Sequence, residues 1–196
     1  MLQNLAQQMI SNLCDEAEEY SLVHDELSAS SGIHVKGTEG QSESPLWHEI
    51  RAFRITGTSF KDYANHPEKM AAALWATKRD LSHLKSIKWG KEKEDVARKD
   101  YEEKTGMKVT CCGIFVSRKC PVFAASPDGI VLCPNGRILI EIKCPFSLKD
   151  NDLSAPQNLK CAFLDSSLSL KKSHQYFYQI QLGMYVTGCK LTHFIV

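Results

Sequence analysis

The spacing of hydrophobic and polar positions predicts helices in both halves of the chain. Between residues 2 and 13, hydrophobic side chains recur at helical intervals, which indicates an amphipathic helix that continues into the acidic stretch DEAEEY. Ser44 and Pro45 are typical of a helix start, because serine caps a first turn and proline fits its first position. Gly106 is a typical C-cap. Helices are expected at residues 2–27, from residue 45, and at 67–77, 88–105, 156–164 and 174–188.

Shorter runs of β-branched and aromatic residues predict strands in the middle and at the end of the chain. They cover residues 109–117, 122–126, 129–133, 137–143 and 190–196. The sequence PNG at 134–136 is typical of a hairpin turn between two of them. Helices, then antiparallel strands, then a helix and a strand indicate a mixed α/β or α+β domain. The last run stops without a turn or cap, so we expect the domain to be incomplete at Val196.

Charge divides the chain into two parts. Residues 1–44 carry one Lys and eight Asp or Glu, which leaves 23 of the 24 basic and 15 of the 23 acidic residues to the remainder. Residues 28–44 are rich in Ser and Gly, which is typical of a linker. We therefore expect an acidic N-terminal arm at 1–43, made of a short helix and a linker, and a folded domain at 44–196. A basic domain suits an anionic partner such as nucleic acid, although scattered solvated lysines would give the same net charge.

The eight cysteines include no CxxC pair and no zinc-finger spacing with histidine. We interpret them as free thiols in a reducing compartment. The sequence has no apolar run of membrane-spanning length and no signal-peptide pattern at its N-terminus. The expectation is a soluble intracellular protein that binds no membrane, with nucleus and cytoplasm both open.

The strand RILIEIK places acidic and basic side chains on one face. Because side chains alternate along a strand, three isoleucines share one face, and Leu139, Glu141 and Lys143 share the other. Taken alone, the strand favours an ion pair on a solvent-exposed surface.

The turn SPDG changes that interpretation through its position. Asp128 is expected to close one strand, and Glu141 and Lys143 lie on the next, joined by the PNG hairpin, so two carboxylates can face each other across neighbouring strands. Such carboxylates repel unless a cation lies between them, and oxygen ligands suit Mg²⁺ or Mn²⁺. A nearby lysine can orient an attacking water and offset phosphate charge. The three residues together fit the requirements of a phosphodiesterase site.

Pro127-Asp128 and Glu141-Ile142-Lys143 form the PD-(D/E)xK nuclease motif. Five blocks along the chain occur in the order seen in one family: WHEIRAFRITGTSF, WGKEKEDVARKDYEEKTG, AASPDGIV, LIEIKCP and HQYFYQIQLGMYVTG. Over residues 44–196 the chain resembles the YqaJ-like viral recombinase family, which includes the lambda-phage exonuclease. The resemblance implies a restriction-endonuclease-like α/β fold, with a central mixed β-sheet flanked by helices.

The resemblance also implies roles for individual residues. Asp128, Glu141 and the carbonyl of Ile142 correspond to metal ligands, and Lys143 to the catalytic lysine. Glu94, in WGKEKE, corresponds to a glutamate that reaches the metal site from a helix. Gln179 corresponds to the glutamine beside the catalytic lysine. From the residues alone, Glu94 is favoured as a solvated helix residue, and Gln179 could be a polar helix position that faces water.

Arg51 corresponds to an arginine that contacts phosphate near the 5′ end of the cleaved strand. Thr58 stands where the family commonly has serine and keeps the hydroxyl group, and the neighbouring Ser59 could also serve.

The implied activity is Mg²⁺- or Mn²⁺-dependent hydrolysis of DNA with two ions, as a 5′→3′ double-strand exonuclease in recombination or DNA processing. The resemblance further implies a homotrimer and a single-strand annealing protein as partner. Two alternatives are a DNA-binding or recombination partner domain without catalysis, and an endonuclease on the same fold.

Overall fold

The computed structural model describes residues 2–21, 27–69, 74, 83–150 and 162–196. Five α-helices are described within these ranges: α1 (Leu2–Ser21), α2 (Pro45–Arg51), α3 (Gly57–Asn65), α5 (Lys85–Thr105) and α6 (Gln175–Thr187). The described strands are β1 (Gly32–His34), β2 (Val109–Thr110), β3 (Phe115–Ser117), β4 (Ala124–Ala125), β5 (Gly129–Cys133), β6 (Gly136–Ile142) and β7 (Leu191–Ile195). Short 3-10 turns occur at η1 (Gln41–Glu43), η2 (Pro67–Lys69) and η3 (Phe146–Leu148).

The strands form two sheets. One has the order β2-β5-β6-β7 and is mixed, because β7 runs parallel to β6 while the other pairs are antiparallel. The second has the order β1-β3-β4 and is antiparallel. The mixed α/β class and the mixed sheet flanked by helices are confirmed, and the second sheet was not predicted.

The predicted strand at 109–117 is divided between the two sheets. Gly113 lies against Thr38 so closely that a Cβ at this position would come within 1.9 Å of the Thr38 hydroxyl oxygen. That hydroxyl accepts a hydrogen bond from the backbone N–H of Ile114, which therefore does not continue the ladder of β2. The chain crosses from one sheet to the other at this contact.

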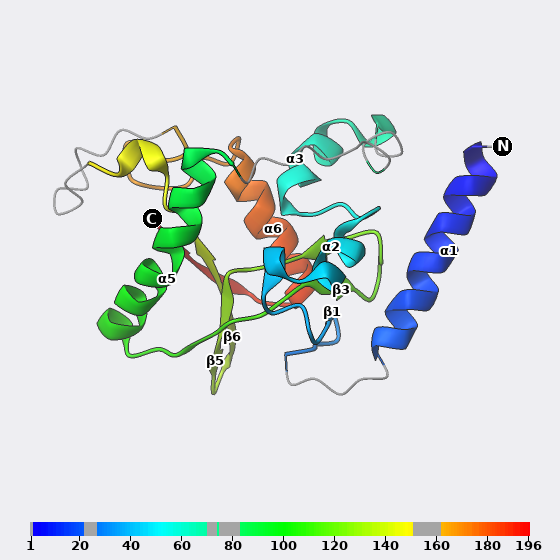
Figure 1. The fold of residues 1–196 in the computed structure, drawn as a ribbon, viewed down its shortest axis with the longest axis horizontal. Coiled ribbons are helices and arrows are strands. Elements are labelled where there is room, and N and C mark those ends of the chain that lie inside the picture. Colours follow the sequence, from blue (N-terminus) through cyan, green and yellow to red (C-terminus); the bar gives the residue numbers. More distant parts are fainter. Residues whose placement is uncertain (1, 22–26, 70–73, 75–82, 151–161) are drawn as a thin grey trace.

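Helices cover both faces of the mixed sheet. The isoleucine face of β6, with Ile138, Ile140 and Ile142, packs with Tyr101 on α5. The opposite face packs through Leu139 against Leu182 on α6. In Figure 1, β5 and β6 accordingly lie between α5 and α6. The alternation predicted from RILIEIK is confirmed, but both of its faces are interior.

The capping and turn residues in the sequence correctly predicted where two helices and one hairpin begin or end. The Ser44 hydroxyl accepts a hydrogen bond from the N–H of Trp47 at 3.3 Å, and Pro45 follows at the first helical position. Gly106 closes α5 in the left-handed conformation, with a φ of +69°. The β5–β6 hairpin pairs Cys133 with Gly136, whose φ of +137° favours glycine.

The linker prediction for 28–44 is wrong at β1. Gly32–His34 is buried and pairs with β3. Glycine is needed there because a Cβ on Gly32 would come within 2.2 Å of the carbonyl oxygen of Val186. A few residues further on, the Gln41 side-chain amide donates to the carbonyl of Pro127. The expected boundary at 43 and 44 therefore cuts through the folded body.

The helix α1 packs on the body of the protein. Leu13 and Ala17 are buried in hydrophobic clusters, and Glu16 accepts a 2.8 Å hydrogen bond from Arg54. In Figure 1, α1 stands at one edge of the molecule.

Two predicted helices fall largely outside the described residues. Of 67–77, the first three residues form η2 and only Leu74 is described beyond them. Of 156–164, only the last three are described, and Leu164 there makes an isolated antiparallel bridge with Leu170. Among the described helices, none combines the length and apolar character needed to cross a membrane.

Candidate active site

The turn before β5 brings Asp128 onto the end of β6. The backbone N–H of Asp128 donates to the carbonyl of Ile140 at 3.2 Å. Its carboxylate Oδ2 accepts the N–H of Ile142 at 2.6 Å. The hairpin pairing of β5 with β6 thus positions Asp128 beside the segment Glu141–Lys143, with one carboxylate oxygen fixed by the backbone.

Glu141 lies on the interior face of β6 that α6 covers. It is only 2% exposed, so the alternative of an ion pair on a solvent-exposed strand is wrong. Its Oε1 accepts hydrogen bonds from the Lys143 ammonium and from the side-chain amide of Gln179. The Lys143 ammonium also lies 5.3 Å from the centre of the Tyr176 ring on α6. Gln179 lies on the site side of α6, whereas Gln181 is exposed.

Burial shapes the protonation of this cluster. It raises the pKa of Glu141 to about 7; Lys143 opposes the shift, and the nearby Asp128 charge adds to it. Burial also raises the pKa of Asp128, against the opposing effect of Lys143. Burial acts to lower the pKa of Lys143, but the charges of Glu141 and Asp128 outweigh it and raise that pKa. The cluster therefore has a strong tendency to hold cations or protons.

Glu94, on α5, interacts with this cluster through the charge of Asp128. Burial raises its pKa to about 7, the charge of Asp128 contributes to the rise, and Arg98 opposes it. Within the described residues, no group of three or more His, Cys, Asp or Glu side chains is arranged so that it could hold a metal ion. Asp128 and Glu141 are thus the acidic pair at the centre, and Glu94 stands to the side.

Arg98 is a neighbour of the cluster to which sequence reasoning gave no role. Its guanidinium donates to Asp95 and to the Cys111 sulfur. Its charge also acts on both Glu94 and Asp128. Its spacing in the sequence could have identified it, because Arg98 follows Glu94 by four residues on α5 and the two therefore share one helix face.

A small cavity of about 40 Å³ connects the cluster with Arg51. Its walls include Arg51, Gly57, Thr58, Glu141 and Gln179, so four residues singled out from the sequence meet there. The Arg51 guanidinium lies 4.1 Å from the centre of the Trp47 ring and donates to the Thr56 hydroxyl at 3.3 Å. Burial lowers the Arg51 pKa to about 10, which leaves the side chain cationic at neutral pH.

Thr58 and Ser59 have different positions. Thr58 lines the cavity, and its hydroxyl lies 3.3 Å from that of Thr56. The Ser59 hydroxyl forms a capping box with Thr56, because it accepts the N–H of Thr56 at 3.1 Å and the Thr56 hydroxyl accepts the N–H of Ser59. Ser59 is not among the cavity walls. The structure brings Thr58, but not Ser59, to the Arg51 cavity.

Three further residues, to which the sequence gave no site role, support the site. Gly57 allows α3 to approach α6, because a Cβ there would come within 2.5 Å of Gln179 Cγ. The Trp47 indole N–H donates to the Ser126 hydroxyl at 2.8 Å. The Gln41 amide donates to Pro127 at 2.9 Å, so Trp47 and Gln41 together hold the SPDG turn.

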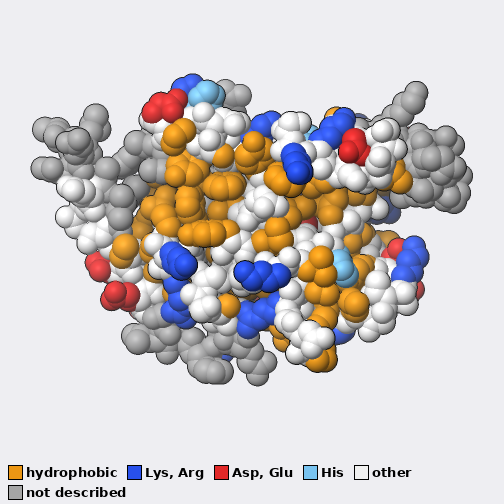
Figure 2. Space-filling view, turned by 180° about the vertical axis from the view of Figure 1, so that it is seen from behind, with side chains coloured by type: hydrophobic (Ala, Val, Ile, Leu, Met, Phe, Trp, Pro, Cys, Tyr) orange, Lys and Arg blue, Asp and Glu red, His pale blue; other side chains and the backbone are white. Residues whose placement is uncertain are grey.

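On the face shown in Figure 2, Lys and Arg side chains lie singly or in small groups among hydrophobic ones. Among the described residues of that face, they form no continuous basic track. The positive charge of residues 45–196 therefore does not locate a path for nucleic acid there, and the geometry around Glu141 and Arg51 carries the functional argument.

Solved structures share this architecture. The chain is similar to an alkaline exonuclease (LHK-Exo) from Laribacter hongkongensis, with a TM-score of 0.55, 24% identity, and coverage of 77% of this chain and 72% of the exonuclease. The same enzyme in complex with dAMP matches with the same values. At this identity the likeness shows the fold, and it confirms the expected restriction-endonuclease-like core. The chain matches none of the curated proteins with which it was compared.

The family model for the YqaJ-like viral recombinase domain matches residues 46–190. This span contains every residue that the sequence singled out for the site, from Arg51 to Gln179. The match confirms the resemblance inferred from the five sequence blocks. The chain belongs to the YqaJ-like viral recombinase domain family.

Proposed function

We propose that this chain is a metal-dependent DNA nuclease whose catalytic residues are Asp128, Glu141, Lys143, Gln179 and Glu94. One observation carries the proposal. Glu141, buried and bonded to Lys143 and Gln179, lines the same small cavity as Arg51 and Thr58. A cationic and hydroxyl-bearing cavity suits a phosphate group, and a carboxylate–lysine pair at its wall suits hydrolysis of the neighbouring phosphodiester.

The donor atoms fit a hard divalent cation such as Mg²⁺ or Mn²⁺, and we propose two ions. Asp128 uses Oδ2 for the N–H of Ile142, and Glu141 uses Oε1 for Lys143 and Gln179, so each carboxylate has a second oxygen to offer. Burial raises the pKa of both acids, and a bound cation would offset the cost of keeping them charged there. The carbonyl of Ile142 would be a further ligand, and the Glu94 carboxylate would assist from the side through its charge.

The chain's own residues have separate tasks in this mechanism. Arg51 and Thr58 bind and orient a phosphate next to the scissile bond, and the N-terminus of α3 at Gly57 adds its positive dipole end there. Lys143 and Gln179 orient the attacking water and offset the charge that develops on the phosphoryl oxygens. A bound divalent cation would supply Lewis-acid polarisation and a more acidic water.

We further propose that the activity is 5′→3′ digestion of duplex DNA in recombination or DNA processing. Family membership and the exonuclease fold support this direction, and Arg51 offers a site for a terminal phosphate. A homotrimer and a single-strand annealing protein as partner are proposed on the resemblance alone. The competing function is DNA binding without catalysis, and an endonuclease is the third candidate.

The test is digestion of an end-labelled duplex with Mg²⁺, with and without chelator. We expect release of mononucleotides from 5′-phosphorylated ends and no loss of closed circular DNA. Lys143→Ala should reduce the rate roughly 10²–10³-fold, whereas Lys99→Ala, an exposed lysine on α5, should not. If neither wild type nor Lys143→Ala hydrolyses DNA while both still bind it, the proposal of catalysis is wrong. Cleavage of circular DNA without preference for ends would overturn the exonuclease direction.

A further inference from the structure

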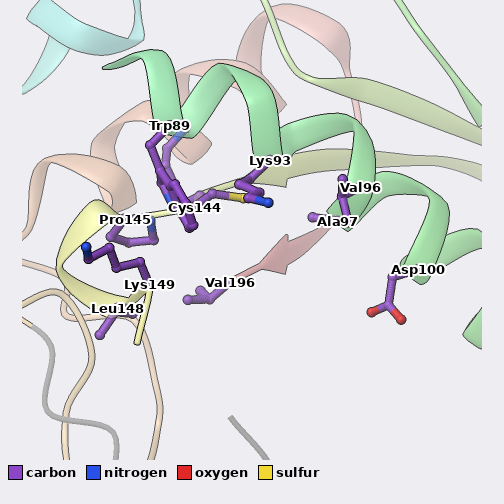
Figure 3. A pocket seen from close by; sticks show the side chains of 11 residues that line it. Trp89, Lys93, Val96, Ala97, Asp100, Cys144, Pro145, Leu148, Lys149 and Val196 are labelled. Atoms are coloured by element: carbon purple, nitrogen blue, oxygen red, sulfur yellow. The ribbon is translucent and has the colours of Figure 1, made fainter. Parts of the chain in front are cut away.

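A second cavity, the Trp89 cleft, lies on the other side of the catalytic lysine. It has a volume of about 350 Å³ and is formed by α5, η3 and the end of β7. Its walls include Trp89, Lys93, Pro145 and Lys149 (Figure 3). Lys143 is also among them. Lys143 lines this cleft and also bonds to Glu141, which lines the Arg51 cavity. The Lys143–Glu141 pair thus stands between the two cavities.

The side chains around the Trp89 cleft combine aromatic rings with cations. The Lys93 ammonium lies 4.9 Å from the centre of the Trp89 ring. Phe146 packs edge-on against Trp89 with ring centres 5.9 Å apart, and the Lys149 ammonium lies 4.8 Å from the Phe146 ring. Asp100 is the acidic side chain among the walls, and Figure 3 shows it at the end of the cleft remote from Trp89. The end that holds the aromatic rings is therefore basic.

We propose that the Trp89 cleft binds one unstacked nucleotide of the cleaved strand, on the side of the scissile phosphate remote from Arg51. The base lies against Trp89, and its phosphate is held by Lys93 and Lys149. The inference rests on the proposed function, since it takes the Lys143–Glu141 pair as the place of the scissile bond. Aromatic side chains bind bases of any sequence through their π-faces, and lysines track the backbone charge.

Charge complementarity favours this occupant over an apolar protein segment. The Lys93 and Lys149 ammonium groups lie over the Trp89 and Phe146 rings, and Lys143 also lines the cleft. Lys143 is paired with Glu141, and Lys149 with Asp150 at 3.6 Å, so Lys93 is the cation of this end that a hydrophobic peptide would cover without supplying an anion. A nucleotide supplies both an apolar face and an anion. The volume of about 350 Å³ accommodates a base together with its sugar.

The probe is a 5′-phosphorylated duplex with a single 2-aminopurine at the first, second or third nucleotide, bound to the full chain in chelator. We expect the emission at the second position to change on binding in wild type and in Trp89→Phe, but not in Trp89→Leu. Trp89→Leu should weaken binding about tenfold. An abasic second nucleotide should lower the affinity of wild type for the duplex about as much as Trp89→Leu does. In Trp89→Leu it should cause no further loss of affinity, because both changes remove the same contact. Lys99→Ala is the matched control on the same helix.

Each outcome bears on a separate claim. If wild type hydrolyses DNA but neither the emission nor the affinity depends on Trp89, nucleotide binding in the Trp89 cleft is wrong and the proposed nuclease activity stands. A Trp89-dependent signal in a chain that hydrolyses no DNA would support the cleft and overturn the nuclease. Should Trp89→Leu fail to fold, Lys149→Ala provides the second variant because Lys149 is exposed. It should lower the affinity for the normal duplex several-fold, and an unchanged affinity would count against the proposal.

Discussion

Gly57 at the start of α3 lies against the side chain of Gln179 on α6, and a Cβ at residue 57 would come within 2.5 Å of Gln179 Cγ. Gln179 in turn donates to Glu141. We therefore expect Gly57→Ala to displace Gln179 and to lower kcat at least tenfold on duplex DNA. Gly40→Ala is the control, since its Cβ would meet nothing nearer than 3.9 Å at an ordinary φ of −69°. A Gly57→Ala enzyme with unchanged kcat would show that Gln179 has no part in turnover.

Arg51 should confer preference for a 5′-terminal phosphate. It lines the cavity next to Glu141, and its planar group can bind phosphate through two N–H donors. We expect wild type to digest 5′-phosphorylated duplex at least tenfold faster than the 5′-hydroxyl duplex. Arg51→Ala should remove most of that difference, and Arg51→Lys should restore little of it, because lysine lacks the fork and packs less well on Trp47. The readout is the ratio of kcat/KM on the two substrates, and a ratio unaffected by Arg51→Ala would contradict the assignment.

The site could be predicted from the sequence where local rules control it. The period of two in RILIEIK placed Glu141 and Lys143 on one face. The SPDG turn and the short hairpin then put Asp128 beside them. The sequence could not show that this face is interior, because its burial depends on α6, whose position is set by packing far along the chain. Taken alone, the strand therefore favours a surface ion pair, and the flanking motifs are needed to identify it as a site.

The strand β1 was missed for a different reason. Three residues are too few for a periodic signal, and the surrounding Ser and Gly are typical of loops. The glycine there serves close packing, since Gly32 lies against the backbone of Val186. Ser59 shows a related limit. A hydroxyl near Arg51 can bind phosphate or cap a helix, and only the structure shows that it caps α3.

Glu16 should stabilise the protein through Arg54. Arg54 is 2% exposed and donates to the carbonyls of Ile50 and Pro121 as well as to Glu16. Removing Glu16 leaves a buried cation with fewer partners, so Glu16→Ala should lower the free energy of unfolding by about 1–3 kcal/mol. The measurement is urea unfolding, with Glu19→Ala, an exposed acid on the same helix, as control. Equal stability of the two variants would contradict a structural role for this contact.

Stability without metal should fall as pH rises from about 4.5 to about 7. Burial raises the pKa of Glu141 from 4.5 to about 7, and Glu94 shifts in the same direction. Between those pH values the folded chain keeps protons that the unfolded chain has lost, so the free energy of unfolding declines and the loss is complete above about pH 7. Divalent cations must displace these protons, so the rise in Tm on adding Mn²⁺ should grow from about pH 5.5 to about pH 8. Glu141→Gln should flatten the decline in chelator and reduce the Mn²⁺ effect, whereas Glu103→Gln, on the exposed side of α5, should change neither. A Mn²⁺-induced change in Tm that is the same at both ends of this range would mean that the ion binds away from Glu141.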